Sequence, residues 1–318
     1  MIVAGALALY AVLVGTVGNT KLAGAAWPAR HPRAAVTIWH SAAAGCVLAV
    51  AAALMLTAHD LTEHGLVWLI CARPNAVHSM YSGGLTLGPG WNFTGLLLVA
   101  AVIYLAATAA VRLSRDRRRR NLCLSGQTEP SDPHLGEDVR VVRDPAALVY
   151  CLSAPPRARP IVVSTGALAA LGAPGVMAAI EHERAHLSQR HHLSVLVADL
   201  VRGLTSKVGL MKSYSLQVRR LCEMAADDAA SHPCGGRTVA RALLDLSDGP
   251  LRSQPVAVLG VVGTATGERI RRLIAGCGDS HADRVRVRRT ARWVGLAVAA
   301  LPFVVAMAPA LAVIGTVH

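Results

Sequence analysis

The sequence predicts an α-helical integral membrane protein with four transmembrane helices, in which an α+β domain is inserted between the third and the fourth helix. The chain of 318 residues is 53% hydrophobic and only 16% charged, which is not the balance of a soluble protein. Several apolar stretches have the length of a membrane span, and one long polar region separates the last two of them. Short apolar runs and helical motifs inside that polar region indicate the α+β domain.

Crossing a hydrocarbon core of about 30 Å requires ~20 mostly apolar residues in a helix. The stretches that meet this requirement are Ile2–Gly18, Ala35–Ala58, Phe93–Val111 and Trp293–Thr316. The chain begins MIVAGALALY, without Lys or Arg and without a clear cleavage site of small residues. We therefore expect the first stretch to be an uncleaved span and not a signal peptide.

Aromatic residues near the ends of these stretches indicate the membrane interface, where Trp is enriched. Trp27, Trp91 and Trp293 occupy such positions. His40 has two interpretations, a functional histidine inside the membrane or an interfacial residue. The adjacent Trp39 favours the interfacial position for His40.

The distribution of cations predicts the orientation, because Lys and Arg near span ends stay on the cytoplasmic side. The third span is followed by RLSRDRRRR, and other cations follow the first span or precede the fourth, namely Lys21, Arg30, Arg33, Arg284, Arg286, Arg288, Arg289 and Arg292. The loop between the second and third spans contains Asp60, Glu63 and a single Arg73. We expect a multi-pass protein of the cell membrane with both termini outside.

This orientation divides the chain into three parts. Residues 1–111 hold three spans with short loops, residues 112–292 form a cytoplasmic domain, and residues 293–318 hold the fourth span and the C-terminus. The net charge of +13 permits a nucleic-acid partner, but Arg117–Arg120 lie against a span end, which favours topology and contact with anionic lipid. We expect the lipid bilayer as a partner and no direct nucleic-acid binding.

Cysteine usage gives no support to two classes of site. The chain has seven Cys and no CxxC pair, and most of them face the membrane or a reducing compartment in the predicted topology. Neither a disulfide scaffold nor a thiolate zinc site is therefore indicated.

The polar region begins with short β-branched or apolar runs, VRVVRD, ALVYCLS and PIVVST, which predict a small sheet with a hairpin. A helical stretch begins at Gly166, and Pro174 stands in the first turn of the next helix. Further helices are predicted over Leu193–Val208 and Leu216–Ala230. This order is typical of an α+β domain and not of a parallel βαβ unit.

The helix after Pro174 contains AAIEHERAHLSQRHH, residues 178–192. Positions four apart on a helix differ by about 40° around its axis, so His182 and His186 face the same way and can bind one ion. Glu183 lies one step round, beside the metal, where its carboxylate can take a proton from a water. This is the HExxH pattern of zinc peptidases, and the alternative is a solvated polar helix face.

A catalytic zinc site needs a third protein ligand. His192 has the spacing of HExxHxxGxxH enzymes, but Gln189 replaces the glycine at which the chain turns, so we expect the helix to continue and His192 to point away. Glu223 in LCEMAADDAA is the favoured ligand, although an exposed acidic turn is the alternative interpretation. Asp227, four residues later, then has a supporting role as hydrogen-bond acceptor for a ligand. His191 and His192 are expected to be polar residues at a membrane-facing or domain-packing surface.

HExxH followed by ExxAD resembles the gluzincin peptidases, and two groups of them fit, namely the HtpX and CAAX-processing membrane proteases and the BlaR/MecR-type antirepressor peptidases. RPIVVSTGALAAL before the motif and ERIRRLIAG near the end of the region look most like the antirepressor family. The resemblance covers about Val139–Gly276 and implies a gluzincin-type zinc peptidase domain between the third and fourth spans, with Zn²⁺ as cofactor. By this resemblance His182, His186 and Glu223 are the zinc ligands and Glu183 is the catalytic glutamate. We expect no external penicillin-binding sensor, because few residues follow the fourth span.

These features lead us to expect a membrane-bound zinc endopeptidase with a cytoplasmic active site. A peptide would add itself to an edge strand formed by PIVVST. Available side chains for stabilising an oxyanion are Tyr214, Arg220 and His232. The resemblance implies a regulatory protein as substrate, such as a BlaI/MecI-type transcriptional repressor. The alternatives are an HtpX-like quality-control protease and a non-catalytic membrane signal transducer.

Overall fold

The computed structural model describes most of the chain with a few gaps. The described residues are 2–60, 128–129, 135–151, 161–205, 209–247, 256–276 and 281–315, with isolated positions between 104 and 115. The predicted third span, Phe93–Val111, lies outside the described residues apart from four positions, 104, 107, 108 and 111. The predicted external loop between Asp60 and Trp91 also lies outside them.

Three helices within the described residues are long and apolar enough to cross a membrane, over Ile2–Gly24, Pro32–Ala58 and Ala282–Met307. The first comprises α1 (Ile2–Val12), the π-helical η1 (Leu13–Gly18) and α2 (Asn19–Gly24). The short α3 (Trp27–Arg30) leads into α4 (Pro32–Asp60), and the last is α13 (His281–Gly315). They overlap the first, second and fourth predicted spans and indicate a multi-pass membrane protein. Each of these helices extends beyond the predicted span into residues that include cations, namely Lys21, Arg33 and Arg284.

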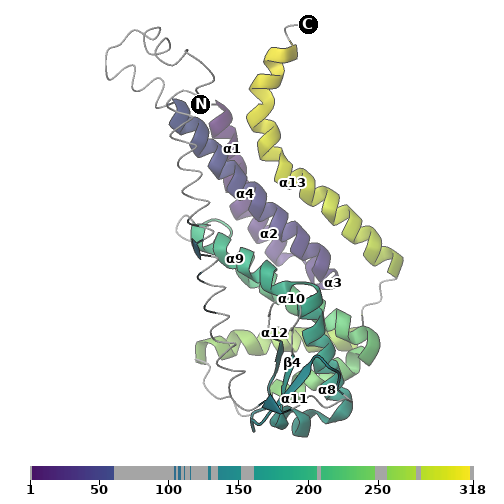
Figure 1. Ribbon diagram of the computed structural model, residues 1–318. Helices are drawn as coiled ribbons and strands as arrows, with labels where there is room; N and C mark the ends of the chain where they lie inside the picture. Colours follow the sequence, from purple (N-terminus) through teal and green to yellow (C-terminus); the bar gives the residue numbers. More distant parts are fainter. Residues whose placement is uncertain are drawn as a thin grey trace.

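The spanning helices pack against one another through small residues. α1, α4 and α13 all pack against one another, and the sheet lies at the end of the bundle opposite to the start of α1 and the end of α13 (Figure 1). Gly45 of α4 is in close contact with α13, and the hydroxyl of Tyr10 donates a hydrogen bond to the carbonyl of Val298 at 2.6 Å. The missing side chain of Gly45 lets the two backbones approach.

The interfacial position expected for Trp39 and His40 is wrong. Trp39 is fully buried among α1, α4 and α10 (Tyr214–Cys234), and Nδ1 of His40 lies 2.5 Å from the hydroxyl oxygen of Tyr214. The packing of α10 against α4 covers this side of the span, so an aromatic residue there meets protein and not the headgroup layer.

The sheet has four strands, β1 (Thr128–Glu129), β2 (Val139–Val142), β3 (Val149–Cys151) and β4 (Ile161–Ser164), in the order β1-β2-β4-β3. β2 and β4 are parallel, and the two outer pairs are antiparallel. The prediction that PIVVST forms an edge strand is wrong, because β4 pairs on both sides and all its residues are buried. Such a continuous apolar run is typical of a central strand, and β3 occupies the edge of the described sheet.

The helices of the domain confirm the sequence prediction of their order. α8 (Thr165–Ser188) is followed by α9 (His191–Thr205), α10, α11 (Gly236–Ser247) and α12 (Val256–Ala275). Gly172 has a φ of 62° and kinks α8 just before Pro174, so a short first helix precedes the helix that carries HERAH. Ser164 caps α8 by accepting a hydrogen bond from the Ala167 amide at 3.0 Å.

The expectation that the HERAH helix continues past Gln189 is wrong. α8 ends at Ser188, and Arg190 has a φ of 53°, a left-handed conformation that a non-glycine residue adopts at some energetic cost. α9 then starts at His191 in a new direction. The chain therefore turns without the glycine, and this turn decides which histidine faces the motif.

Two apolar cores organise the molecule. One packs the sheet against α8, α11 and α12, with Ile161, Val163 and Ile180 fully buried. The other packs α1 and α4 against α9 and α10, with Leu7, Trp39 and Tyr214 fully buried. α10 contributes to both, since its first half lies in the second core and Ala230 lies in the first. The helix that carries Glu223 thus joins the membrane bundle to the sheet domain.

The close approach at Gly45 generates a test of the bundle packing. A methyl group added there meets the carbonyl oxygen of Val298 at 2.9 Å and the hydroxyl of Tyr10 at 2.7 Å. Gly45→Ala should therefore lower the free energy of unfolding by about 1–3 kcal/mol, measured by thermal unfolding in detergent. Gly5→Ala is the control, because nothing lies within 4 Å of its added methyl. Equal midpoints for the two variants would contradict this packing.

Candidate metal centre

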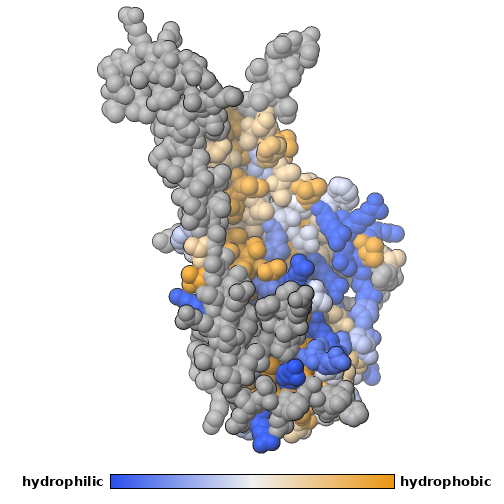
Figure 2. Space-filling view, in the orientation of Figure 1, coloured by the Kyte–Doolittle hydropathy of each residue, from blue (hydrophilic) through white to orange (hydrophobic). Residues whose placement is uncertain are grey.

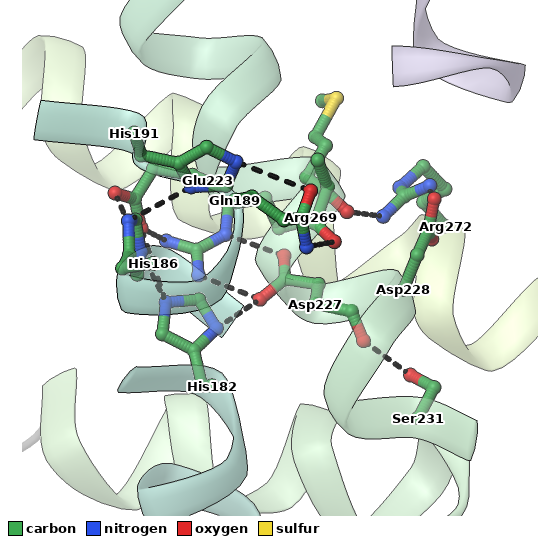
Figure 3. Close-up of polar contacts among 12 residues, drawn as sticks. His182, His186, Gln189, His191, Glu223, Asp227, Asp228, Ser231, Arg269 and Arg272 are labelled. Carbon is green, nitrogen blue, oxygen red and sulfur yellow. Dashed lines mark hydrogen bonds and ion pairs between the residues drawn. The ribbon is translucent and has the colours of Figure 1, made fainter. Parts of the chain in front are cut away.

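Two packed helices supply the side chains of the candidate centre. α8 carries His182, Glu183 and His186, and α10 carries Glu223 and Asp227. The two helices pack against each other, and Ala225 and Ala226 next to Glu223 on α10 are small and buried. The two sequence motifs lie on separate helices, and the fold brings their side chains together in one cluster (Figure 3).

His182, His186 and Glu223 form a group in which one ligand atom of each residue lies within 4.8 Å of the others. The two Nε2 atoms are 3.1 Å apart, and each lies 3.4 Å from an oxygen of Glu223. Ligand atoms bound at ~2.0–2.2 Å in a tetrahedral shell are about 3.3 Å apart. The group therefore has the donor set and the spacing to hold one metal ion.

Asp227 supports His182 from the other side of the ring. Its Oδ1 lies 3.0 Å from Nδ1 of His182, which directs Nε2 of the same ring toward His186 and Glu223 (Figure 3). The Asp227 side chain is fully buried, and the guanidinium of Arg269 on α12 donates two hydrogen bonds to it, each 2.7 Å long. A buried carboxylate requires such partners, because an unpaired charge is costly in the interior.

Arg269 also lies 3.2 Å from Glu223, so one cation neutralises both acids. Burial alone would raise the pKa of Glu223, but His182, Arg269 and His186 lower it to about 2. Burial would likewise raise the pKa of Asp227, which Arg269 and His182 hold well below its usual range. Both carboxylates are therefore ionised at neutral pH.

The histidines differ in charge when no metal is bound. Burial would lower the pKa of His182, but Asp227 and Glu223 raise it to about 9. Burial lowers the pKa of His186, and His182 adds to this effect. At neutral pH the ring of His182 is therefore cationic and that of His186 is neutral, so an arriving cation must displace one proton from His182.

Glu183 projects toward the edge of the sheet. Its Oε2 accepts a hydrogen bond from the amide of Cys151 in β3 at 2.9 Å. The Ser164 amide donates to the carbonyl of Leu148, so by the two-residue alternation of an antiparallel pair the backbone groups of Val149 and Cys151 face outward. The HERAH helix and the edge strand thus enclose one space beside the histidines.

His191 is the neighbour of His186, a contact that the expected membrane-facing or domain-packing position did not include. It is 6% exposed, and its Nδ1 lies 3.0 Å from Nδ1 of His186. Its Nε2 lies 3.3 Å from Oε1 of Gln189, whose amide nitrogen donates to the carbonyl of Ala225 at 3.5 Å. The left-handed turn at Arg190 makes this contact and leaves His192 outside the group of ligand atoms.

This chain of contacts has one consistent set of proton positions. The Gln189 amide nitrogen is a donor only, so Oε1 accepts from Nε2–H of His191. Nδ1 of His191 is then an acceptor for Nδ1–H of His186. Burial and His186 lower the pKa of His191 to about 3, which keeps it neutral. His186 is left with an unprotonated Nε2 that faces His182 and Glu223.

A pocket of about 930 Å³ opens beside this group. Cys151, His186 and Glu223 line it at one end, and Leu196, Asp199 and Arg219 line it along α9 and α10. Glu223 is the more accessible ligand, since 40% of its side chain is exposed against 12% for His182 and 17% for His186. The group is therefore reached from the pocket on the side of Glu223 and of β3.

The three residues considered for oxyanion stabilisation have other partners. Tyr214 is fully buried beside His40, Arg220 forms an ion pair with Glu268, and His232 lies 3.2 Å from Arg284. The structure instead brings Arg269 and His191 to the group. Sequence spacing could not predict that Arg269 contacts the group, because Arg269 lies 42 positions after Asp227. A pair of adjacent histidines after HERAH was a signal for His191, but only the turn assigns it.

Comparisons of the chain with protein-family models, with curated proteins and with solved structures find no match. The interpretation of the centre therefore depends on its own residues and geometry.

The proton on His182 generates a pH prediction. A cation needs neutral imidazoles, and of the three ligands only His182 is in its protonated, acid form near neutral pH and must lose a proton. The apparent dissociation constant for Zn²⁺ should therefore rise about tenfold for each unit that the pH falls below about 8. A chelator competition titration, corrected for protonation of the chelator, measures it. A constant affinity over this range would contradict the assignment.

The contact between His191 and His186 generates a second prediction. His191→Leu removes the acceptor for Nδ1–H of His186 and should weaken Zn²⁺ binding about 10–100-fold in the same titration. His191→Asn retains an acceptor oxygen and should recover part of the affinity. His192→Leu is the matched control and should bind Zn²⁺ like the parent. An unchanged affinity for His191→Leu would show that this contact does not orient the ligand.

Proposed function

We propose that the chain is a membrane-bound zinc endopeptidase with a cytoplasmic active site. The observation that carries the proposal is the convergence of His182, His186 and Glu223 into one group, with Glu183 at the adjoining sheet edge. The alternative interpretation, a polar helix face without a metal, does not explain why a carboxylate from a second helix lies 3.4 Å from both imidazoles. A metal site without catalytic function does not explain why Glu183 is held beside the edge strand β3.

The donor set favours zinc. Two imidazoles and one carboxylate from the protein, with the fourth position left open, are the ligands of one common class of catalytic zinc site. Zinc bound there would lower the pKa of a water and polarise a carbonyl group. The roles of metal ligand for His182, His186 and Glu223, and of supporting residue for Asp227, follow from this proposal.

The protein's own residues supply the rest of the reaction. Glu183 has one carboxylate oxygen held by the Cys151 amide, and the other remains to take a proton from a water and to pass it to the leaving amine. Burial and ionisation of Asp227 keep the His182 ring in one orientation. Arg269 is paired with both Glu223 and Asp227, and Glu183 is the remaining carboxylate, to which we assign the role of base.

A substrate strand fits along β3 and not along β4. The outward backbone groups of Val149 and Cys151 can pair with an extended peptide, which would lie across the mouth of the pocket. Backbone pairing provides affinity without strong dependence on the peptide sequence. It also competes with Glu183 for the Cys151 amide, so a bound peptide would release the carboxylate toward the reacting groups.

The substrate that we propose is a regulatory protein, such as a BlaI/MecI-type transcriptional repressor, by the family resemblance of the motifs. In the proposed topology the domain lies in the cytoplasm and both chain ends lie outside the cell. This arrangement would suit a cytoplasmic substrate. An HtpX-like quality-control protease shares the ligand set and is the second candidate. The pocket lies along α9 and α10, both of which contact the spanning helix α4, and this suits that alternative because it would admit a segment leaving the bilayer.

Two variants separate catalysis from metal binding. Glu183→Gln should keep Zn²⁺ and lose cleavage, since it retains the shape of the base but cannot accept a proton. Glu223→Gln should lower both metal content and cleavage. Digestion of β-casein by the purified full-length protein, with fragments identified by mass spectrometry, measures activity, and elemental analysis measures zinc. Comparison of cytoplasmic proteins cut in cells with the parent and with Glu183→Gln identifies the substrate.

A matched control is Glu181→Gln, because Glu181 lies on the same helix and pairs with Arg184 away from the histidines. It should keep both zinc and activity. Cleavage by Glu183→Gln at the parental rate would contradict the assigned base. Full zinc content without cleavage by the parent would favour the non-catalytic transducer.

A further inference from the structure

A second pocket, of about 140 Å³, lies apart from the metal group. Three segments distant in the sequence meet around it, namely the end of α3 with the start of α4, the second half of α10 and the first turns of α13. Four arginines line it, Arg30, Arg33, Arg284 and Arg288. The expected function of the chain as a peptidase uses none of these residues.

The charges around this pocket do not balance. Asp228 is the one carboxylate among its described lining residues, and Asp228 is in an ion pair with Arg272 at 2.7 Å. Arg284 lies 3.2 Å from Nε2 of His232, which has no negative charge to offer. Four guanidiniums thus share a space with one acid that a fifth guanidinium already contacts. An anion in the pocket would relieve this repulsion.

The backbone adds to the positive potential. Pro32, Arg33 and Ala34 line the pocket and form the first turn of α4, a helix of 29 residues. The first N–H groups of a helix, here those of Arg33 and Ala34 because Pro32 has none, have no partner within the helix, and its macrodipole is positive at that end. The guanidiniums and the helix terminus therefore act on the same small volume, as in many phosphate sites.

The pocket lies at the level where two candidate spans begin, Pro32–Ala58 and Ala282–Met307. Figure 2 shows hydrophilic residues gathered where the apolar surface of the spanning helices ends. Trp293, two turns after Arg286 on α13, is 65% exposed, as is common for residues at the membrane interface. In a membrane this level is that of the lipid headgroups.

Retention of cations at span ends explains why arginines are near this level, but not why they converge. Arg286 and Arg289 satisfy the same topological rule on the same helix and do not line the pocket. Arg30 and Arg288, which are 258 positions apart (288 − 30), do line it. Convergence from separate segments indicates a binding site.

We propose that this pocket binds the phosphate headgroup of an anionic lipid. Guanidinium groups bind phosphate oxygens in a bidentate geometry, and basic pockets between spanning helices bind such headgroups. The volume is well below that of a pocket for a drug-sized ligand, ~300–1,000 Å³, and fits a small charged group whose acyl chains remain outside. A bound lipid would tie the start of α4 to α13 and to α10, the helix that carries Glu223.

Lipid titration of the full-length protein in detergent, followed by native mass spectrometry, tests the proposal. The lipids are dioleoyl phosphatidylglycerol and, as zwitterionic reference, dioleoyl phosphatidylcholine. The parent should bind phosphatidylglycerol at least tenfold more tightly than phosphatidylcholine. The double variant Arg284→Gln with Arg288→Gln should lose about tenfold in affinity for phosphatidylglycerol. The control Arg286→Gln with Arg289→Gln removes the same charge from the same helix and should change the affinity less than twofold.

Equal losses in the two double variants would overturn the proposal, since they would indicate a diffuse field and not a site. Equal affinity of the parent for the two lipids would overturn it as well. Inorganic phosphate distinguishes the source of the anion, because tight binding of free phosphate that phosphatidylglycerol does not displace would contradict a lipid ligand. Zinc content and circular dichroism of each variant establish that it is folded, and Arg30→Gln repeats the test from α3 if the α13 variant is not.

Discussion

The arrangement depends on one buried interaction, in which Asp227 lies between the ring of His182 and the guanidinium of Arg269. A carboxylate with no exposed surface is stable only if its charge is matched, so the three helices α8, α10 and α12 must meet at this point. The same contacts direct His182 toward His186 and bring Arg269 to Glu223. The geometry of the metal group is thus a consequence of satisfying one internal charge.

α10 connects this interaction to the membrane. Its first half packs with Trp39 and Leu7 in the core of the spanning helices, and Tyr214 at its start contacts His40. Nine residues separate Tyr214 from Glu223, about two and a half helical turns. No loop intervenes between the contact of α10 with α4 and the side chain of Glu223, because both lie on one continuous helix. Asp228 on the same helix belongs to the basic pocket near the ends of α4 and α13.

The helical elements could be predicted because their signals are local. Length and hydropathy define α4 and α13, and the spacing of His182 and His186 defines a shared helix face. The pairing of the strands and the contacts between distant segments could not be predicted in the same way. Nothing in PIVVST distinguishes a central from an edge strand until β3 is placed, and the turn at Arg190 contradicts the usual preference for glycine. Arg269 and His191 reach the group through tertiary contacts, which have no spacing in the sequence.

The central question is which atoms bind the metal. Cys151 and Cys222 line the same pocket as His186 and Glu223, so two thiols lie near the proposed ligands. X-ray absorption spectroscopy at the zinc edge of the purified full-length protein answers it directly. The account predicts one zinc per chain bound only by nitrogen and oxygen, at ~2.0–2.2 Å. A zinc–sulfur distance of about 2.3 Å, or a spectrum unchanged by Glu223→Gln, would contradict it.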